Sequence, residues 1–188
     1  MQITPKATGL ALVVLATLVL TGCVQQPPHV IPTSDPSVEP VFKSDAAALA
    51  AAKKAYLAYS AMSDTIGLDG GKHPERIAKW VTASDLVTET KVFNDFAKTG
   101  DHLTGESVIS YFALQQVSQA RTGRVDLTAY VCDDVSGSHL VSATGDDVTP
   151  PSRQNLAPLQ VQFKNASPGS KTLLIDGSQP WSGQNFCS

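Results

Sequence analysis

The chain has 188 residues, of which 42% are hydrophobic and 16% charged, and it carries a formal net charge of −3. This length and composition support one globular domain with an apolar core. The mild excess of acids, with lysines and arginines scattered along the chain, excludes the basic footprint of a nucleic-acid-binding protein.

The N-terminal segment has the features of a lipoprotein leader. Lys6 is followed by the uncharged run 10–20, which is shorter than the roughly 20 residues needed to span a bilayer. A Leu-Thr-Gly-Cys sequence then ends at Cys23, the pattern of a lipoprotein processing site. An ordinary secretory signal that contains a cysteine is the alternative. We therefore expect a signal peptide at residues 1–22 and palmitate-type acylation at Cys23, which would tether the mature chain to the extracytoplasmic face of the cell membrane.

The segment that follows is rich in proline. Residues 23–43 contain Pro27, Pro28, Pro32, Pro36 and Pro40. Proline blocks helix and favours extended chain, so twenty such residues reach roughly 60 Å. We expect a Pro-rich tether here, although a disordered leader without a specific role fits the same composition. The domain should then occupy residues 44–188.

Helix formers dominate from Asp45 onward, and Ser44 or Asp45 can cap the first turn. An apolar stripe at helical spacing predicts a first helix that ends before Gly67; it consists of Leu49, Ala52, Tyr56 and Tyr59. Pro74 can open a second, short helix that ends near Thr82. A third helix is predicted from about Ser84 to Lys98, with Gly100 as its C-terminal cap.

The apolar period changes from 3.6 to 2 after Gly105, which indicates strands. We expect strands at residues 106–118, 125–132, 139–143, 159–164 and 171–176, with the Pro150-Pro151 pair excluded from any central strand. Helices followed by an antiparallel meander predict an α+β fold, with the helices packed on one face of the sheet.

The cysteine count favours a disulfide. Once Cys23 is lipidated, Cys132 and Cys187 are the pair that remains. Outside the cytoplasm such a pair is typically bridged, and the four isolated histidines offer no partners for a zinc site. Trp181, close to Cys187, either covers the sheet edge and the disulfide or holds a ligand.

Three short motifs resemble those of a known family. They are Trp-Val-Thr-Ala-Ser-Asp-Leu at residues 80–86, Tyr-Val-Cys-Asp-Asp-Val-Ser-Gly at 130–137 and Pro-Trp-Ser-Gly-Gln-Asn-Phe-Cys at 180–187. Together with the order of elements they resemble small actinobacterial lipoproteins with a nuclear transport factor 2-like (SnoaL-like) domain. The resemblance implies three N-terminal helices packed on a curved, cone-like antiparallel sheet, and it implies that Cys132 and Cys187 pair. It implies no particular activity.

Some members of the wider fold are ketosteroid isomerases and polyketide cyclases, which place an Asp base and a donor in an apolar pocket. The residue types for this chemistry are present, but no motif sets a base opposite a donor; the candidates are Tyr56, Tyr59, Tyr111, Tyr130, Asp126 and Asp176. We therefore expect no enzyme, no catalytic residues and no cofactor.

Metal binding is not expected either. The acid pairs Asp133-Asp134 and Asp146-Asp147 lie beside glycine turns, where they supply too few closely spaced oxygen atoms for a calcium loop.

The sequence therefore predicts a membrane-tethered, non-catalytic domain that binds a small apolar ligand or a protein partner. The space between helix and sheet is the expected pocket, lined by Tyr56, Tyr59, Trp80, Phe93 and Tyr111. A ketosteroid-isomerase-like or cyclase-like enzyme is the first alternative. A self-associating scaffold, such as a homodimer, is the second, and it would show a filled interior with an exposed apolar face.

Overall fold

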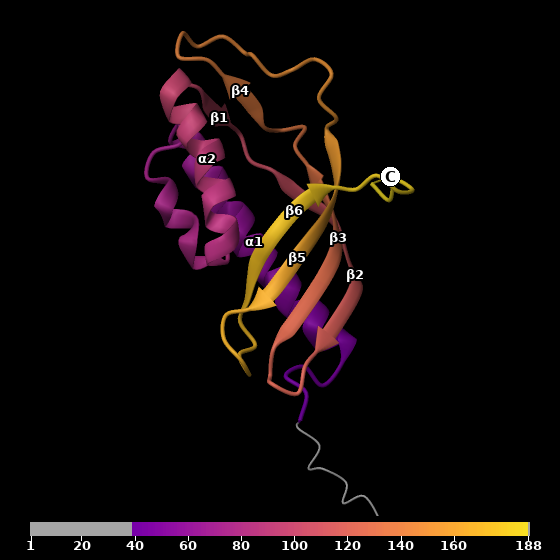
Figure 1. Cartoon of the computed structure of the whole chain (residues 1–188). Helices are drawn as coiled ribbons and strands as arrows, with labels where there is room; N and C mark the ends of the chain where they lie inside the picture. Colours follow the sequence, from indigo (N-terminus) through magenta and orange to yellow (C-terminus); the bar gives the residue numbers. More distant parts are fainter. Residues whose placement is uncertain (1–38, 188) are drawn as a thin grey trace, which may run out of the picture. The chain divides into compact units, whose positions relative to one another are not determined.

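The computed structural model describes residues 39–187. The predicted leader, Cys23 and most of the tether lie outside these residues. The described chain has α1 (Asp45–Leu68), the 3₁₀ helix η1 (Pro74–Lys79) and α2 (Ala83–Thr99), followed by strands. The predicted α+β class is confirmed: helices are combined with open antiparallel sheets (Figure 1).

The strands form two sheets. The larger has the antiparallel order β2 (Val108–Gln119), β3 (Val125–Asp134), β5 (Leu156–Asn165) and β6 (Leu173–Pro180). β1 (His102–Thr104) and β4 (His139–Val141) form a small second sheet that lies apart from the larger one, toward one end of α2 (Figure 1). β1 is a strand that the sequence patterns did not predict, because three residues are too few to show alternation.

Helix α1 begins at its predicted cap, where the Ser44 hydroxyl accepts a hydrogen bond from Ala47 N. Its buried stripe starts at Ala48 instead of Leu49, and it continues through Ala52 and Tyr56. The helix also runs past its predicted end to include Gly67. A Cβ at Gly67 would lie 2.5 Å from Leu103 Cδ1, so the glycine leaves room for this side chain of β1.

The short middle helix begins at Pro74, as predicted, but it ends at Lys79 and is the 3₁₀ helix η1, entered through His73 in a left-handed conformation. α2 begins close to the predicted position, because the Thr82 hydroxyl accepts from Asp85 N and caps the first turn. It ends at Gly100 (φ 78°), the predicted left-handed cap.

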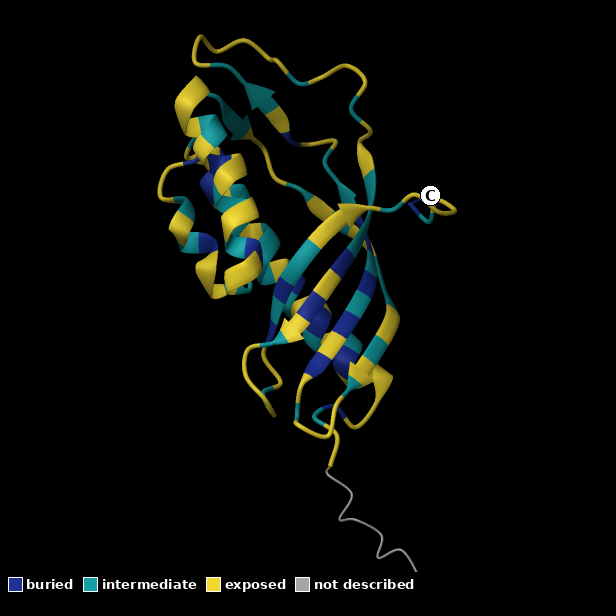
Figure 2. Cartoon of the chain, viewed as in Figure 1, coloured by how far each residue is buried: buried dark blue, intermediate teal, exposed yellow. Residues whose placement is uncertain are grey.

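The core lies between α1, α2 and the inner face of the larger sheet, where buried residues alternate along β3 and β5 (Figure 2). Packing starts before α1, inside the segment expected to be tether. Phe42 is 4% exposed, its N–H donates to Gln119 Oε1 (2.8 Å), and its carbonyl accepts from Gln119 Nε2 (2.9 Å).

The disulfide Cys132–Cys187 confirms the predicted pairing. It joins β3 to the C-terminal segment across a sequence separation of 55, with Cα atoms 5.4 Å apart. A bridge that closes a loop of this size stabilises a domain by about 4 kcal/mol in the chain-entropy model.

Candidate functional site

The space predicted to be a pocket is occupied by aromatic side chains. The ring of Phe112 lies 6.0 Å from that of Tyr56 and 6.4 Å from that of Phe163. Tyr56 is 3% exposed and Phe93 is 5% exposed, so both belong to the core. Two of the predicted pocket residues therefore fill the region that they were expected to line.

Carboxyl groups also reach this interior. The hydroxyl of Tyr59 donates to Glu89 Oε2 (2.9 Å), and burial is the main cause that raises the pKa of both groups. Asp85 lies nearby with a buried Oδ2 that has no hydrogen-bond partner. Burial, followed by the charge of Asp176, raises the pKa of Asp85. The interior thus holds several acids and no compensating base among these contacts.

A groove of about 460 Å³ runs between the second half of α1 and the start of β2. We call it the α1–β2 groove. Its apolar and hydroxyl-bearing lining includes two acids and no base; the residues are Leu57, Ser60, Ala61, Asp64, Thr65, Leu68, Glu106, Ser107, Val108 and Ile109. Three of them are large apolar side chains that face solvent: Leu57 is 46% exposed, Leu68 40% and Val108 62%.

A carboxylate–serine cluster forms the floor of the α1–β2 groove. Asp64 Oδ2 accepts hydrogen bonds from Ser107 N (3.3 Å) and Ser107 Oγ (3.4 Å), and Ser60 Oγ lies 3.2 Å from Ser107 Oγ. Asp133 reaches the same region from β3 with a buried Oδ1 that lacks a partner. Burial first, and then Asp64 and Asp134, raise the pKa of Asp133 to about 6, against the lowering effect of Ser107.

The two edges of the larger sheet differ. The segment at residues 80–82 covers β6 at Ile175, which accepts from Thr82 N (2.8 Å) and donates to Trp80 O (2.8 Å). No strand within residues 39–187 pairs with the outer edge of β2, which borders the α1–β2 groove. An unpaired edge of this kind offers backbone donors and acceptors to an added strand.

Tyr111 lies on the opposite side of the sheet from its expected position. A register shift between Ile109 and Tyr111 inserts one extra residue into β2, so that Tyr111 pairs with the outward-facing Cys132. Such a bulge reverses the alternation of side chains, and the period-2 pattern alone cannot reveal it. Tyr111 is 44% exposed, and its ring lies 5.5 Å from that of Phe186.

Trp181 belongs to an aromatic cluster on the outer sheet face, together with Tyr111, Tyr130 and Phe186. The ring of Trp181 packs edge-on against that of Tyr130 (4.9 Å), and the Trp181 Nε1 donates a hydrogen bond to Gln184 O (3.1 Å). The ring of Phe186 lies 5.1 Å from that of Tyr130. These contacts place Trp181 over the outer sheet face beside the bridge. Trp80 lies elsewhere, in a groove between α1, η1 and the segment before β6.

The carboxylates considered as catalytic bases do not face the interior. Asp126 is exposed. Asp176 bonds to Lys164 Nζ (2.6 Å) and Thr82 Oγ1 (2.7 Å). Partial burial alone would raise the pKa of Asp176, but these hydrogen bonds hold it below its usual range. The interior acids are instead Glu89, Asp85, Asp64 and Asp133. Asp133 was within reach of sequence reasoning, because it continues the inward alternation of Leu127, Ala129 and Val131.

No helix within residues 39–187 is long and apolar enough to cross a membrane. Among the same residues, no three His, Cys, Asp or Glu side chains cluster closely enough to hold a metal ion.

Comparison with known proteins shows solved structures with a similar fold, but it identifies no family. No family model matches the sequence, and no curated protein matches it either. Among solved structures, the chain is similar to the intermembrane space region of the chloroplast protein ARC6, with a TM-score of 0.50 at 9% identity over 70% of this chain and 95% of that one. At this identity the likeness concerns the fold alone.

Two further structural matches have TM-scores below 0.5. A periplasmic fragment of TraM gives a TM-score of 0.47 at 12% identity, covering 74% of this chain and 98% of that one. An IcmL-like type IV secretion system protein from Legionella pneumophila gives 0.38 at 15% identity, covering 77% and 98%.

Proposed function

We propose that this chain is a lipid-anchored, extracytoplasmic interaction domain that takes an extended segment of a protein partner into the α1–β2 groove. The observation that carries this proposal is the convergence of three exposed apolar side chains, Leu57, Leu68 and Val108, on one groove beside an unpaired strand edge. Exposed apolar patches mark interaction sites, and a free edge adds main-chain hydrogen bonds to an incoming strand.

The filled interior favours a protein partner over a small apolar ligand. The rings of Tyr56, Phe112 and Phe163 occupy the space in which such a ligand would bind. The acids Asp64 and Glu106 on the groove wall complement a segment that carries basic side chains between apolar ones. The net negative charge of the chain argues against a nucleic-acid partner.

A non-catalytic role is part of the proposal. An isomerase-like site needs a free carboxylate within hydrogen-bond reach of a tyrosine. Glu89 is the carboxylate that a tyrosine reaches, and it is already bonded to Tyr59. Asp133 has the unpartnered oxygen, but no tyrosine bonds to it. The contact with a tyrosine and the unpartnered carboxylate oxygen therefore belong to different residues, Glu89 and Asp133.

The anchor and the family remain proposals as well. The leader pattern before Cys23 supports lipidation, and the Cys132–Cys187 bridge supports an oxidising compartment outside the cytoplasm. α1 packed against an antiparallel sheet supports a nuclear transport factor 2-like (SnoaL-like) fold. The three motifs at residues 80–86, 130–137 and 180–187 support the kinship with actinobacterial lipoproteins.

Site-specific photo-cross-linking in cells tests the groove. A photoreactive amino acid at Val108 should give one discrete adduct, whereas the same label at Val87, which is 74% exposed on α2, should give none. Leu57→Ser should abolish the Val108 adduct, while the matched change Val87→Ser should leave it intact. Equal labelling from both positions, or an adduct that survives Leu57→Ser, would contradict the proposal. An adduct made of two copies of this chain would instead identify the self-associating scaffold.

A further inference from the structure

A second groove lies on the other flank of α1, and it has the opposite charge. It encloses about 420 Å³ between the first half of α1, η1 and the segment that leads into β6. We call it the lysine groove. Its lining holds three lysines and no acid; the residues are Ala51, Lys54, Ala55, Ala58, Lys79, Trp80, Lys171, Thr172 and Leu173.

The three lysines reach this groove from separate elements: Lys54 from α1, Lys79 from η1 and Lys171 from the segment before β6. All three are exposed, and within residues 39–187 none forms an ion pair, although four other lysines do. A chain with a net negative charge has acids available to pair with them. Their charges therefore gather, uncompensated, at one place.

The floor of the lysine groove, meaning the part of its lining that is less exposed than the lysines, is apolar. Ala51, Ala55 and Ala58 come from α1, while Trp80 and Leu173 come from the other segments. An indole ring has an apolar body and a polar N–H, a combination that suits the boundary between lipid and water. A basic rim over an apolar floor matches a ligand with an anionic head joined to a hydrocarbon body.

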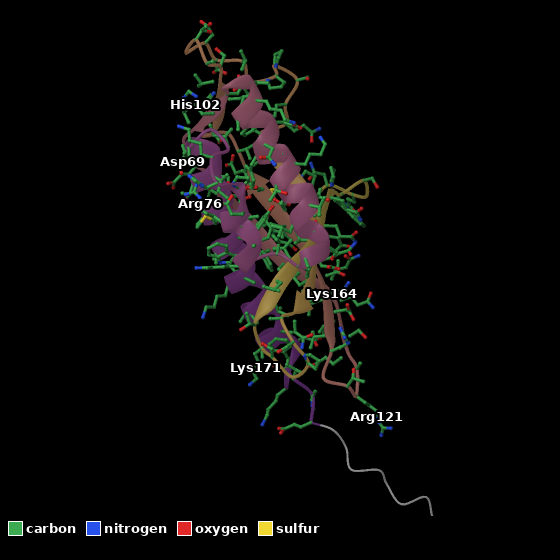
Figure 3. All side chains as sticks on the ribbon, turned by 60° about the vertical axis from the view of Figure 1, so that its left-hand side comes forward. Asp69, Arg76, His102, Arg121, Lys164 and Lys171 are labelled. Atoms are coloured by element: carbon green, nitrogen blue, oxygen red, sulfur yellow. A yellow bond between two sulfur atoms is a disulfide. The ribbon has the colours of Figure 1, made fainter. Side chains whose placement is uncertain are left out.

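We propose that the lysine groove binds the headgroup of an anionic phospholipid, and so seats the domain on the membrane beside its anchor. The lysines contact the phosphate, while the alanines and Trp80 contact the first carbons of the lipid. Figure 3 shows Lys171 toward the end of the domain at which the described chain begins. The lipid anchor is part of the proposed function, whereas the lysine groove and its charge are observed independently of it.

Vesicle binding by the purified chain without its leader (residues 23–188, with Cys23→Ser so that no acyl chain is attached) tests the groove. We expect sedimentation with vesicles of equal parts phosphatidylcholine and phosphatidylglycerol, and none with phosphatidylcholine alone. The double variant Lys79→Gln/Lys171→Gln should lower the partition coefficient about thirty-fold, since each lysine near an anionic surface contributes about a factor of five. The matched control Lys53→Gln/Lys72→Gln, which removes the same charge from exposed lysines outside the groove, should lose far less.

Fluorescence locates the contact. In a Trp181→Phe background, the emission of Trp80 should shift to shorter wavelength when phosphatidylglycerol vesicles are added. Equal losses in the two double variants, an unchanged Trp80 emission, or no binding by the parent chain would each overturn the proposal. Release from vesicles by soluble glycerol phosphate would also overturn it, because the site would then bind a free anion. Failure of the cross-linking test at Val108 would leave these results unaffected, so the two proposals are separable.

Discussion

The two flanks of helix α1 differ in charge and in the elements that they face, although they belong to the same helix. Lys54 and Ala58 face a basic groove closed by Trp80, while Leu57 and Asp64 face an acidic, apolar groove beside the open edge of β2. Both flanks border the same buried stripe, because positions three or four apart repeat on one face of a helix. One rigid element thus separates two surfaces of opposite charge, and each surface suits a different partner.

The largest expected effect comes from the buried stripe of α1, which lies between the two flanks. Tyr56→Ala should lower the free energy of unfolding by about 3–5 kcal/mol, the usual cost of deleting a large buried ring, because Tyr56 packs on Phe112 and Tyr59. Leu57→Ala, one residue further on, should change it by about 0.5 kcal/mol or less. Urea unfolding of the two variants measures the difference. Similar losses would mean that Leu57 is not a free surface residue.

Removing the disulfide should lower the stability of the domain without changing its binding to vesicles. Cys132→Ser/Cys187→Ser should cost about 2–4 kcal/mol, yet neither cysteine lines either of the two grooves. Vesicle partition below the unfolding transition should therefore match that of the parent chain. Thermal unfolding with and without reductant gives the first quantity. Loss of partition in a folded variant would tie the lysine groove to the C-terminal segment.

On the acidic flank, Asp133 should make the free energy of unfolding depend on pH. Asp133 binds its proton more tightly in the folded chain, with a pKa of about 6 against 3.8. Its contribution to stability is therefore complete below about pH 4 and is lost as the pH rises through about 6. Asp133→Asn should stabilise the domain by about 1–2 kcal/mol at neutral pH, a figure reduced from the full shift because the group is partly solvated. That advantage should vanish near pH 4, and a constant difference from acid to neutral pH would contradict it.

The smallest effect on stability is expected on the basic flank, because the three groove lysines form no ion pair within residues 39–187. Lys54→Gln, Lys79→Gln and Lys171→Gln should each change the free energy of unfolding by about 0.5 kcal/mol or less. Lys164→Gln is the matched control, because it removes the 2.6 Å ion pair with Asp176 and should cost up to about 1 kcal/mol. Chemical denaturation at low salt compares the four variants. A larger loss at any groove lysine would assign it a structural role.

Much of the fold could be predicted from the sequence, because it depends on local chemistry. The Ser44 cap, the alanine-rich stripe of α1, the Gly100 cap and the alternation of β3 all have short-range signals, and the cysteine count indicated the bridge. Features that depend on register had no such signal. The bulge beside Ile109 turned Tyr111 outward, and the pairing of β1 with β4 appears only once both strands are placed.

The candidate site was predicted less well, for a related reason. Both grooves are made of residues distant in sequence, such as Leu68 with Val108 and Lys54 with Lys171, and each residue is ordinary by itself. Among the aromatic residues that stood out in the sequence, Trp80 does line the lysine groove, whereas the others fill the interior or cover the outer sheet face. Ten residues at 3.6 per turn put Lys54 and Asp64 only about 80° apart around α1, so helical spacing does not assign them to different grooves and does not identify the element that each groove meets.

The central claim is that the two flanks of α1 have separate ligands, and a lipid titration followed by NMR tests it most directly. Isotope-labelled chain would be titrated with bicelles that contain phosphatidylglycerol. The account predicts shifts in the amide signals of Lys54, Ala58 and Lys171 and in the indole N–H signal of Trp80, with no change at Leu57, Asp64 or Val108. Shifts of equal size at Leu57 and Val108, or at both flanks together, would contradict it.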